Sequence, residues 1–209
     1  MTLRQALLAL IEAGPTTGYD LAKQFDRSVS YIWHAQHSQI YTELRRLERD
    51  GLIASEVLPR GSKELATKRA YRLTEPGAAE LVRWVAETET PDGVRDPAYV
   101  KSTYLEYGSA AVARAFFRAH RRYYESLRDR YEAHIDELQA RATPLLRRRL
   151  ERAPADSHDA IVAFKVHAYH GMVARARAEI AWANEGLDLV ATLDRDAGRG
   201  SMLTPRYSD

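Results

Sequence analysis

The fold is decided by HSQIYTELRRLERDGLI, residues 37–53. Its apolar residues Ile40, Leu44 and Leu47 recur at i, i+4 and i+7, a spacing that predicts an amphipathic helix over about 37–50. Gly51 is expected to end this helix, because glycine readily adopts the left-handed backbone that follows many helices. The stretch therefore predicts one well-anchored helix, from which the rest of the domain can be worked out.

The face opposite these apolar residues is polar. With 3.6 residues per turn, this face and its flanks carry hydroxyl, phenol and guanidinium groups, on Ser38, Tyr41, Thr42, Arg45, Arg46 and Arg49. Such groups contact base edges and phosphates when a helix enters a DNA major groove. Taken alone, the pattern fits a solvated helix face about equally well.

A predicted β-hairpin follows the polar-faced helix. Residues 52–57 and 69–73 have strand character. The loop between them, residues 58–68, holds the three cations Arg60, Lys63 and Lys68. A hairpin directly after a third helix is typical of a winged helix, and a basic tip suits phosphate or the minor groove. The hairpin therefore favours DNA binding over a merely solvated face.

The residues around this core pattern complete a small domain. Residues 3–11 repeat Leu and Ile at helical spacing and stop at Gly14-Pro15. A threonine at position 16 or 17 is expected to cap a second helix, and Thr74 is expected to cap a fourth. We therefore predict a winged helix-turn-helix domain over residues 1–87.

Composition narrows the function. The net charge is only +2, so any DNA contact must come from a local patch rather than a basic coat. Residues 31–72 supply such a patch, with eight Lys or Arg against five Asp or Glu. The absence of cysteine excludes disulfides, thiol nucleophiles and thiolate metal sites. The longest apolar run near the start, residues 6–11, is too short for a membrane span or signal peptide, so we expect a cytoplasmic protein.

Three short motifs resemble the PadR family of bacterial transcriptional regulators. They are TGYDL at 17–21, HSQIY at 37–41 and LTEPG at 73–77. Position 42 is often proline in that family, whereas this chain has Thr42. The resemblance covers about residues 3–87 and implies a DNA-binding regulator with a winged helix.

The resemblance also implies roles for individual residues. Tyr19 and Tyr41 would touch the DNA backbone, the start of the third helix would enter the major groove, and wing cations would reach flanking phosphates. Arg46 has the alternative of pairing with Glu43 or Asp50, and Arg69 the alternative of bridging the wing to the domain body. The expected DNA-binding residues are Tyr19, Ser38, Gln39, Tyr41, Thr42, Arg45, Arg46, Lys63, Lys68 and Arg69.

The second half is predicted to be all helical. Residues 88–95 have linker composition, and Asp96-Pro97 should start a short helix. A long amphipathic, coiled-coil-like helix is expected over 110–142, and a last long helix after Ser157. We therefore predict an antiparallel helical dimerisation domain over 96–194, a tail over 195–209 and a mainly α fold.

These features lead to one main functional hypothesis. The apolar stripe of residues 110–142 needs other helices to cover it, and two-fold dimers of such regulators contact two half-sites. We expect a homodimer, formed through the C-terminal helices, that represses transcription from a palindromic double-stranded DNA operator until a small aromatic effector releases it. The alternative is a helical interaction or ligand-sensor module that does not bind DNA.

Candidate ligand sites are less sharply defined. The family resemblance implies aromatic effectors, and the residues proposed to contact one are Tyr31, Trp33, Tyr104 and Phe116, with ordinary core packing as the alternative. The histidine pairs 34/37 and 167/170 lack an obvious third metal ligand, so we predict no metal site and no cofactor. Phosphate-loop, nucleophile-elbow and HExxH motifs are absent from the sequence, which argues against an enzyme.

Overall fold

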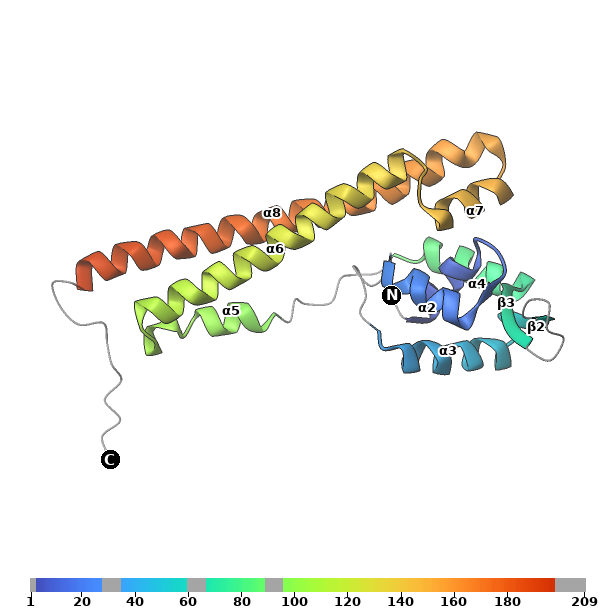
Figure 1. Cartoon of the computed structure of the whole chain (residues 1–209), viewed down its shortest axis with the longest axis horizontal. Helices are drawn as coiled ribbons and strands as arrows, with labels where there is room; N and C mark the ends of the chain where they lie inside the picture. The colour runs from blue at the N-terminus through green and yellow to red at the C-terminus, as the bar shows by residue number, and fades with distance from the viewer. Residues whose placement is uncertain (1–2, 28–34, 60–66, 89–95, 198–209) are drawn as a thin grey trace, which may run out of the picture. The chain divides into compact units, whose positions relative to one another are not determined.

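The computed structural model describes residues 3–27, 35–59, 67–88 and 96–197. The chain divides into two units, which are described separately (Figure 1). The N-terminal unit comprises residues 1–90 and 142–158, and the helical unit comprises residues 91–141 and 159–209.

The N-terminal unit has the predicted winged-helix order. Three helices precede a β-hairpin, and a further helix follows it (Figure 1). The elements are α1 (Leu3–Ile11), β1 (Thr16–Thr17), α2 (Gly18–Arg27), α3 (His37–Arg49), β2 (Ile53–Pro59), β3 (Thr67–Leu73) and α4 (Glu75–Ala86). The hairpin that the sequence analysis expected is therefore confirmed.

A short third strand adds to the hairpin. Thr16 and Thr17 pair with Tyr71 and Ala70 of β3, so the sheet order is β1-β3-β2. Thr17 also caps α2 as predicted, because its Oγ1 accepts a hydrogen bond from the backbone N–H of Asp20 at 3.1 Å. The sequence analysis anticipated the cap but not the strand, which is too short to leave a period-2 pattern.

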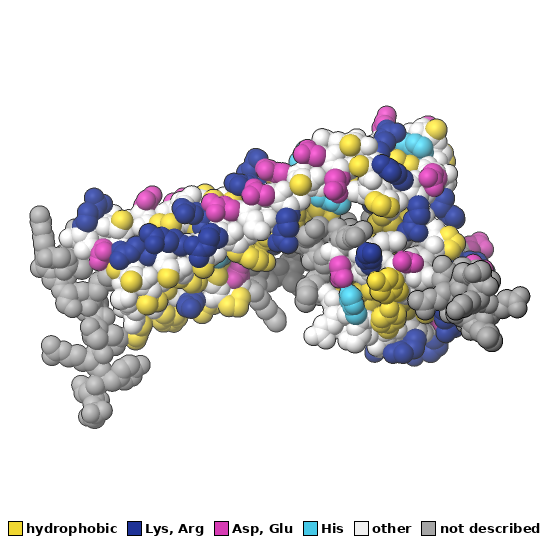
Figure 2. Space-filling view, in the orientation of Figure 1, with side chains coloured by type: hydrophobic (Ala, Val, Ile, Leu, Met, Phe, Trp, Pro, Cys, Tyr) yellow, Lys and Arg dark blue, Asp and Glu magenta, His cyan; other side chains and the backbone are white. Residues whose placement is uncertain are grey.

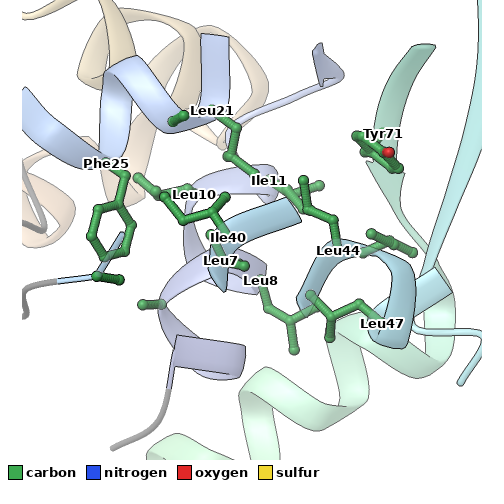
Figure 3. Close-up of a cluster of buried hydrophobic side chains, with 14 residues drawn as sticks. Leu7, Leu8, Leu10, Ile11, Leu21, Phe25, Ile40, Leu44, Leu47 and Tyr71 are labelled. Carbon is green, nitrogen blue, oxygen red and sulfur yellow. The ribbon is translucent and has the colours of Figure 1, made fainter. Parts of the chain in front are cut away.

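The core of the N-terminal unit lies among the first three helices. Ile40, Leu44 and Leu47 of α3 are fully buried, which confirms the predicted apolar stripe. Figure 3 shows them packed with Leu7, Leu8, Leu10 and Ile11 of α1 and with Leu21 and Phe25 of α2. This packing holds α3 with its polar side facing outward.

Two glycines shape the connections of this unit. Gly51 has φ +73° directly after the end of α3, which confirms its predicted role. Gly77 lies in the first turn of α4, where an added Cβ would come 2.0 Å from the carbonyl oxygen of Leu52. Thr74 caps α4 and also donates a hydrogen bond to the carbonyl oxygen of Gly51 at 2.7 Å. The LTEPG motif therefore joins the end of α3 to the start of α4.

Helix α7 (Pro144–Arg152) belongs with the N-terminal unit rather than with the helices that flank it in sequence. Leu145 packs against the N-terminal core, and Arg149 lies 3.5 Å from the carboxylate of Glu12. The sequence analysis had placed these residues in the helical domain. Chain order alone favoured that placement, whereas the contacts of α7 pair it with α1 and the turn after it.

The helical unit contains α5 (Pro97–Ser102), a short turn (Leu105–Tyr107), α6 (Ala110–Gln139) and α8 (His158–Ala197). Arg114 near the start of α6 pairs with Asp194 near the end of α8, and Tyr131 near the end of α6 contacts Tyr169 near the start of α8. The two long helices are therefore antiparallel, as predicted. Helix α8 extends to Ala197, slightly into the predicted tail, and the remaining tail lies outside the described residues. Among the helices described, none combines the length and apolar character needed to span a bilayer.

Candidate nucleic-acid interface

The outward face of α3 carries the polar groups that the sequence analysis singled out. Ser38, Gln39, Tyr41, Thr42, Arg45 and Arg46 are all exposed. Figure 2 shows basic side chains gathered over α3. Since the opposite face of the helix is fixed in the core, these groups project from a rigid element.

Thr42 and Arg45 form a small hydrogen-bonded group on this face. The Thr42 hydroxyl donates to the carbonyl oxygen of Ser38 at 2.9 Å, and Arg45 donates to the same hydroxyl at 3.4 Å. Within the described parts of the chain, Arg45 forms no ion pair with a carboxylate. Its positive charge is therefore available to a phosphate or a base edge.

Arg46 and Arg69, the other two arginines predicted to bind DNA, each form an ion pair with a glutamate. Arg46 lies 3.4 Å from the carboxylate of Glu43, one of the two partners the sequence analysis considered. Arg69 donates to Glu48 at 2.8 Å and to the Ser55 hydroxyl at 2.6 Å. Arg69 thus bridges the wing to α3, which was the structural alternative considered for it.

Gln39 also has a structural contact. Its side-chain oxygen accepts a hydrogen bond from the backbone N–H of Gln36 at 2.9 Å and so closes the first turn of α3. Nearby, His37 of α3 bonds to Asp26 of α2 at 2.9 Å. The start of the helix is therefore held by side chains from within α3 and from α2.

A small hollow lies beside α3, and its lining includes three tyrosines and a glycine. Its volume is about 470 Å³, and its lining residues are Thr17, Gly18, Tyr19, Asp20, Tyr41, Arg69 and Tyr71. The Tyr41 ring covers Gly18 so closely that an added Cβ there would lie 2.7 Å from the ring. Tyr19 is 70% exposed at the rim. Gly18 thus allows Tyr41 to lie next to Tyr19, and the two hydroxyls that the family resemblance paired come from neighbouring elements.

Two residues of this hollow were not predicted as site residues. Gly18 and Tyr71 lie within the motifs quoted above, but nothing in their spacing marks them as neighbours of Tyr41. Burial is the main cause that raises the pKa of Tyr71 above its ordinary value.

The end of α3 is held by an ion pair to α1. Arg4 lies 2.9 Å from Asp50, and its hydrogen bond is the first cause that lowers the pKa of the Asp50 carboxyl. Three acids of this region are therefore paired: Asp50 with Arg4, Glu43 with Arg46 and Glu48 with Arg69. Among the residues that the structure describes, none of these acids pairs with Arg45 on the outward face.

Several predicted site residues cannot be placed. Lys63 lies outside the described residues, as do the ligand candidates Tyr31 and Trp33. Lys68 belongs to β3, but its side chain is not described. The described ranges contain no cluster of three or more His, Cys, Asp or Glu side chains able to hold a metal.

The other two ligand candidates lie in the helical unit. Tyr104 lines a cavity of about 1080 Å³ beside α5 and α8. Phe116 packs against Trp182 and lies 5.7 Å from the Lys101 ammonium. Glu179, also in the lining of the cavity, is 6% exposed and was not singled out from the sequence. A charged residue on a long, charge-rich helix gives no sequence signal of its burial.

The chain resembles known transcriptional regulators. Residues 7–83 match the model of the Transcriptional regulator PadR-like family. The chain is 40% identical over 92 residues to the probable transcriptional regulator Rv1176c of Mycobacterium tuberculosis, which is 44% of this chain and 47% of that protein. It therefore spans about half the length of that relative. It is 29% identical over 144 residues to the negative transcriptional regulator PadR of Bacillus subtilis, which is 68% of this chain and 78% of that protein.

Solved structures show the same fold. The B. subtilis PadR structure in complex with operator DNA has a TM-score of 0.68 at 24% identity, covering 90% of this chain and 98% of that one. The same protein in complex with p-coumaric acid gives 0.62 at 24% identity, covering 90% and 95%. The Vibrio cholerae virulence activator AphA gives 0.65 at 23% identity, covering 92% and 99%.

Proposed function

We propose that the chain, whose residues 7–83 match the PadR-like family of transcriptional regulators, is a repressor that binds a palindromic operator as a homodimer and leaves it when a small-molecule effector binds. Residues 1–87 would hold the DNA-binding function, and residues 96–194 would hold the dimer contacts. Residues 142–158 contact the N-terminal unit and would link the two functions.

The observation that carries the proposal is the outward face of α3. It presents an unpaired guanidinium, Arg45, next to the exposed hydroxyls of Ser38 and Tyr41. A helix with its inner face locked in a core and its outer face rich in such groups suits the major groove. In this role Arg45 and Ser38 would contact base edges.

The phenols and the wing would hold the DNA backbone. Tyr19 and Tyr41 line one hollow beside α3, and their hydroxyls are suited to hydrogen bonds with phosphate oxygens. Lys63 and Lys68 of the wing would add salt-dependent affinity. Arg46 and Arg69 would contribute mainly by positioning, since each is already bound to a glutamate.

A homodimer is supported by the apolar side chains that the helical unit leaves exposed. A single chain exposes large apolar groups over α5, the turn that follows it, α6 and α8, namely Val100, Tyr104, Tyr107, Val112, Tyr123, Phe164, Leu189 and Leu193. Exposed apolar groups in this number are typical of a surface that another chain covers. A second copy would bring two recognition helices to the two halves of a palindrome.

The names of relatives support both negative regulation of transcription and a small-molecule effector. The B. subtilis protein is named a negative regulator, and its solved structures include complexes with operator DNA and with p-coumaric acid. By analogy, this chain would be released from DNA by a small aromatic compound. AphA is named an activator, so a reporter assay has to establish the sign for this chain.

The test uses the full chain and the DNA upstream of its own coding sequence. Arg45→Ala combined with Tyr41→Phe should weaken binding at least tenfold, because loss of a specific arginine contact costs about 1–3 kcal/mol. Arg118→Ala on α6 removes an exposed guanidinium from the helical unit and serves as the control, with no change expected. Binding is measured by gel shift against a scrambled sequence at several salt concentrations.

Three outcomes would contradict the proposal. Equal affinity of the double variant and the control would remove α3 from the interface. Equal affinity for upstream and scrambled DNA would favour a helical interaction module. A sedimenting mass of one chain, instead of two, in analytical ultracentrifugation would exclude the homodimer.

A further inference from the structure

Three polar side chains form a closed ring of hydrogen bonds between α3 and both strands of the wing. Glu48 comes from α3, Ser55 from β2 and Arg69 from β3. The Ser55 hydroxyl donates to Oε1 of Glu48 at 2.5 Å, and Nε of Arg69 donates to the Ser55 hydroxyl at 2.6 Å. Nη2 of Arg69 donates to the same Glu48 oxygen at 2.8 Å. Each member of this Glu48–Ser55–Arg69 network therefore bonds to the other two.

The strand register explains why these side chains meet. Ser55 lies opposite Tyr71 in the antiparallel pair, and Arg69 lies two residues from Tyr71 on the same face of β3. A long side chain can reach its diagonal neighbour on the adjacent strand. The Arg69 guanidinium also lies 6.0 Å from the centre of the Tyr71 ring, which belongs to the same buried cluster as Leu44 of α3 (Figure 3). Arg69 is therefore held by two hydrogen bonds and an aromatic ring.

The network attaches the wing to α3 at a second point, away from the base of the hairpin. At the base, the Thr74 backbone N–H donates to the carbonyl oxygen of Leu52 at 3.2 Å, and its hydroxyl donates to that of Gly51 at 2.7 Å. Arg69 lies four residues before Leu73 at the end of β3, or roughly 13 Å along the strand. A hairpin attached only at its base can tilt, whereas two points of attachment fix its angle. The network therefore sets the angle between the wing and α3.

The network is too exposed to contribute much to stability. The Arg69 side chain is 56% exposed and the Glu48 side chain is 26% exposed. Ion pairs as open to solvent as this one add little to the free energy of unfolding. Glu48 also lies one turn after Arg45 on α3, where an acid is expected to repel DNA phosphates. A positioning role gives a reason for an acid at this place.

We propose that Glu48 and Ser55 are positioning residues for DNA binding and that they act through Arg69. They hold the wing at the angle at which its cations reach phosphates while α3 lies in the major groove. An acidic residue is therefore needed for tight binding to a polyanion. The proposal rests on the proposed function, because it explains how two parts of that interface are kept at a fixed spacing.

The test replaces Glu48 and Glu56 separately by Gln in the full chain. Glu56 follows Ser55 on β2, so it points to the other face of the strand, and it forms no ion pair within the described parts of the chain. Both variants lose one negative charge near the wing, but only Glu48→Gln breaks the network. Binding to the upstream DNA is measured by fluorescence anisotropy at several salt concentrations. Glu48→Gln should bind about fivefold more weakly, because phosphate contacts are lost, whereas Glu56→Gln should bind no more weakly than the unaltered chain.

The salt dependence separates positioning from a general loss of folded protein. Each phosphate contact that is lost lowers the slope of log affinity against log salt concentration by about 1. Glu48→Gln removes no cation, so a lower slope in this variant means that cations of the wing no longer reach phosphates. Partial unfolding would reduce the apparent affinity and leave the slope unchanged. Circular dichroism checks the folded fraction directly.

A neutral variant and a double-mutant cycle test how the effect is transmitted. Ser55→Ala removes only a hydroxyl from the network and should weaken binding in the same direction, so it serves as the test if Glu48→Gln does not fold. In a chain that already carries Lys63→Ala and Lys68→Ala, neither variant should weaken binding further. The reason is that the angle of the wing no longer matters once its lysines are gone.

The inference is overturned by any of three results. They are Glu48→Gln binding as tightly as Glu56→Gln, weaker binding with an unchanged salt slope, and equal weakening in the chain without the wing lysines. Together with specific binding by the unaltered chain, each of these contradicts only this inference. Equal affinity of the unaltered chain for upstream and scrambled DNA contradicts the proposed function itself.

Discussion

The two units of this chain are built on different principles. The N-terminal unit closes around its own core, in which Leu7, Leu21, Ile40, Leu44 and Leu47 are all fully buried. The helical unit consists mainly of two long antiparallel helices, and of the thirty residues in α6 only six are buried. Some of its aromatic side chains pack against one another, such as Phe116 and Phe117 against Trp182, whereas Phe164 is 77% exposed.

The difference implies that the two units have different tasks, because only the N-terminal unit has a closed core of its own. A domain with a closed core can hold the polar face of α3 in place without help from another chain. A two-helix unit buries less and leaves apolar surface for a partner and space for a ligand. The units should therefore respond to different substitutions, and three predictions test how separate they are.

The largest effect is expected for Gly77→Ala in the N-terminal unit. The new methyl group would lie 2.0 Å from the backbone oxygen of Leu52 and 2.8 Å from Leu73, so the joint between α3 and α4 must move. Overpacking of this kind costs about 3 kcal/mol. Urea unfolding followed by circular dichroism measures the loss, and hydrogen exchange localises it.

In this variant, exchange should speed up in α1 to α4 and stay unchanged in α6. Faster exchange in both units to the same extent would show that they unfold together. Ala78→Gly, at the next position of α4, is a matched control. It should cost only about 1 kcal/mol, because it alters helix propensity without a clash.

A smaller and opposite pattern is expected for Gly186→Ala in the helical unit. The added Cβ would lie 2.4 Å from the ring of Phe117, a side chain that can shift at the expense of its contact with Trp182. We expect a loss of about 2 kcal/mol confined to α6 and α8. Gly171→Ala on the same helix meets nothing within 4 Å and should instead gain about 0.8 kcal/mol. A stabilised Gly186→Ala variant would refute the close approach of the two helices.

The smallest effect is a pH dependence of the helical unit. Burial, followed by the nearby charge of Glu179, raises the pKa of Tyr124 from 10.0 to about 12. Above pH 10 the unfolded chain loses this proton while the folded chain keeps it, so stability should fall as the pH rises toward 12.

The measurement is urea unfolding at a series of pH values above 10, monitored together with ultraviolet titration of the tyrosines. Tyr124→Phe should flatten the fall in stability. An unchanged slope in that variant would assign the effect to another group, such as Tyr99, whose pKa is also raised.

Much of the fold could be predicted because its signals are local. The spacing of Ile40, Leu44 and Leu47 marked α3, and Thr74 and Gly51 marked helix ends that the structure confirms. The strand at Thr16 and Thr17 was missed because two residues carry no periodicity, and its existence depends on β3 more than fifty positions later.

The candidate site was predictable only in part. Residue types on one helix face follow from the helical repeat, so Ser38, Tyr41 and Arg45 could be grouped from the sequence. Which arginines are free could not, because the partners of Arg69 are Glu48 and Ser55, far from it in the chain. The same limit concealed Glu179, whose burial depends on Tyr99 and His120 from two other helices.

By itself, the sequence determined the order of helices, the outward polar face of α3 and the resemblance to PadR-like regulators, since all three depend on spacings within a few turns. The tertiary structure decided the rest: Arg45 without an ion pair to any described carboxylate, Gly18 under Tyr41, α7 within the N-terminal unit and the buried carboxylate of Glu179. The physical reason is that charge pairing and burial are set by groups brought together across the chain, and a one-dimensional pattern does not record those distances.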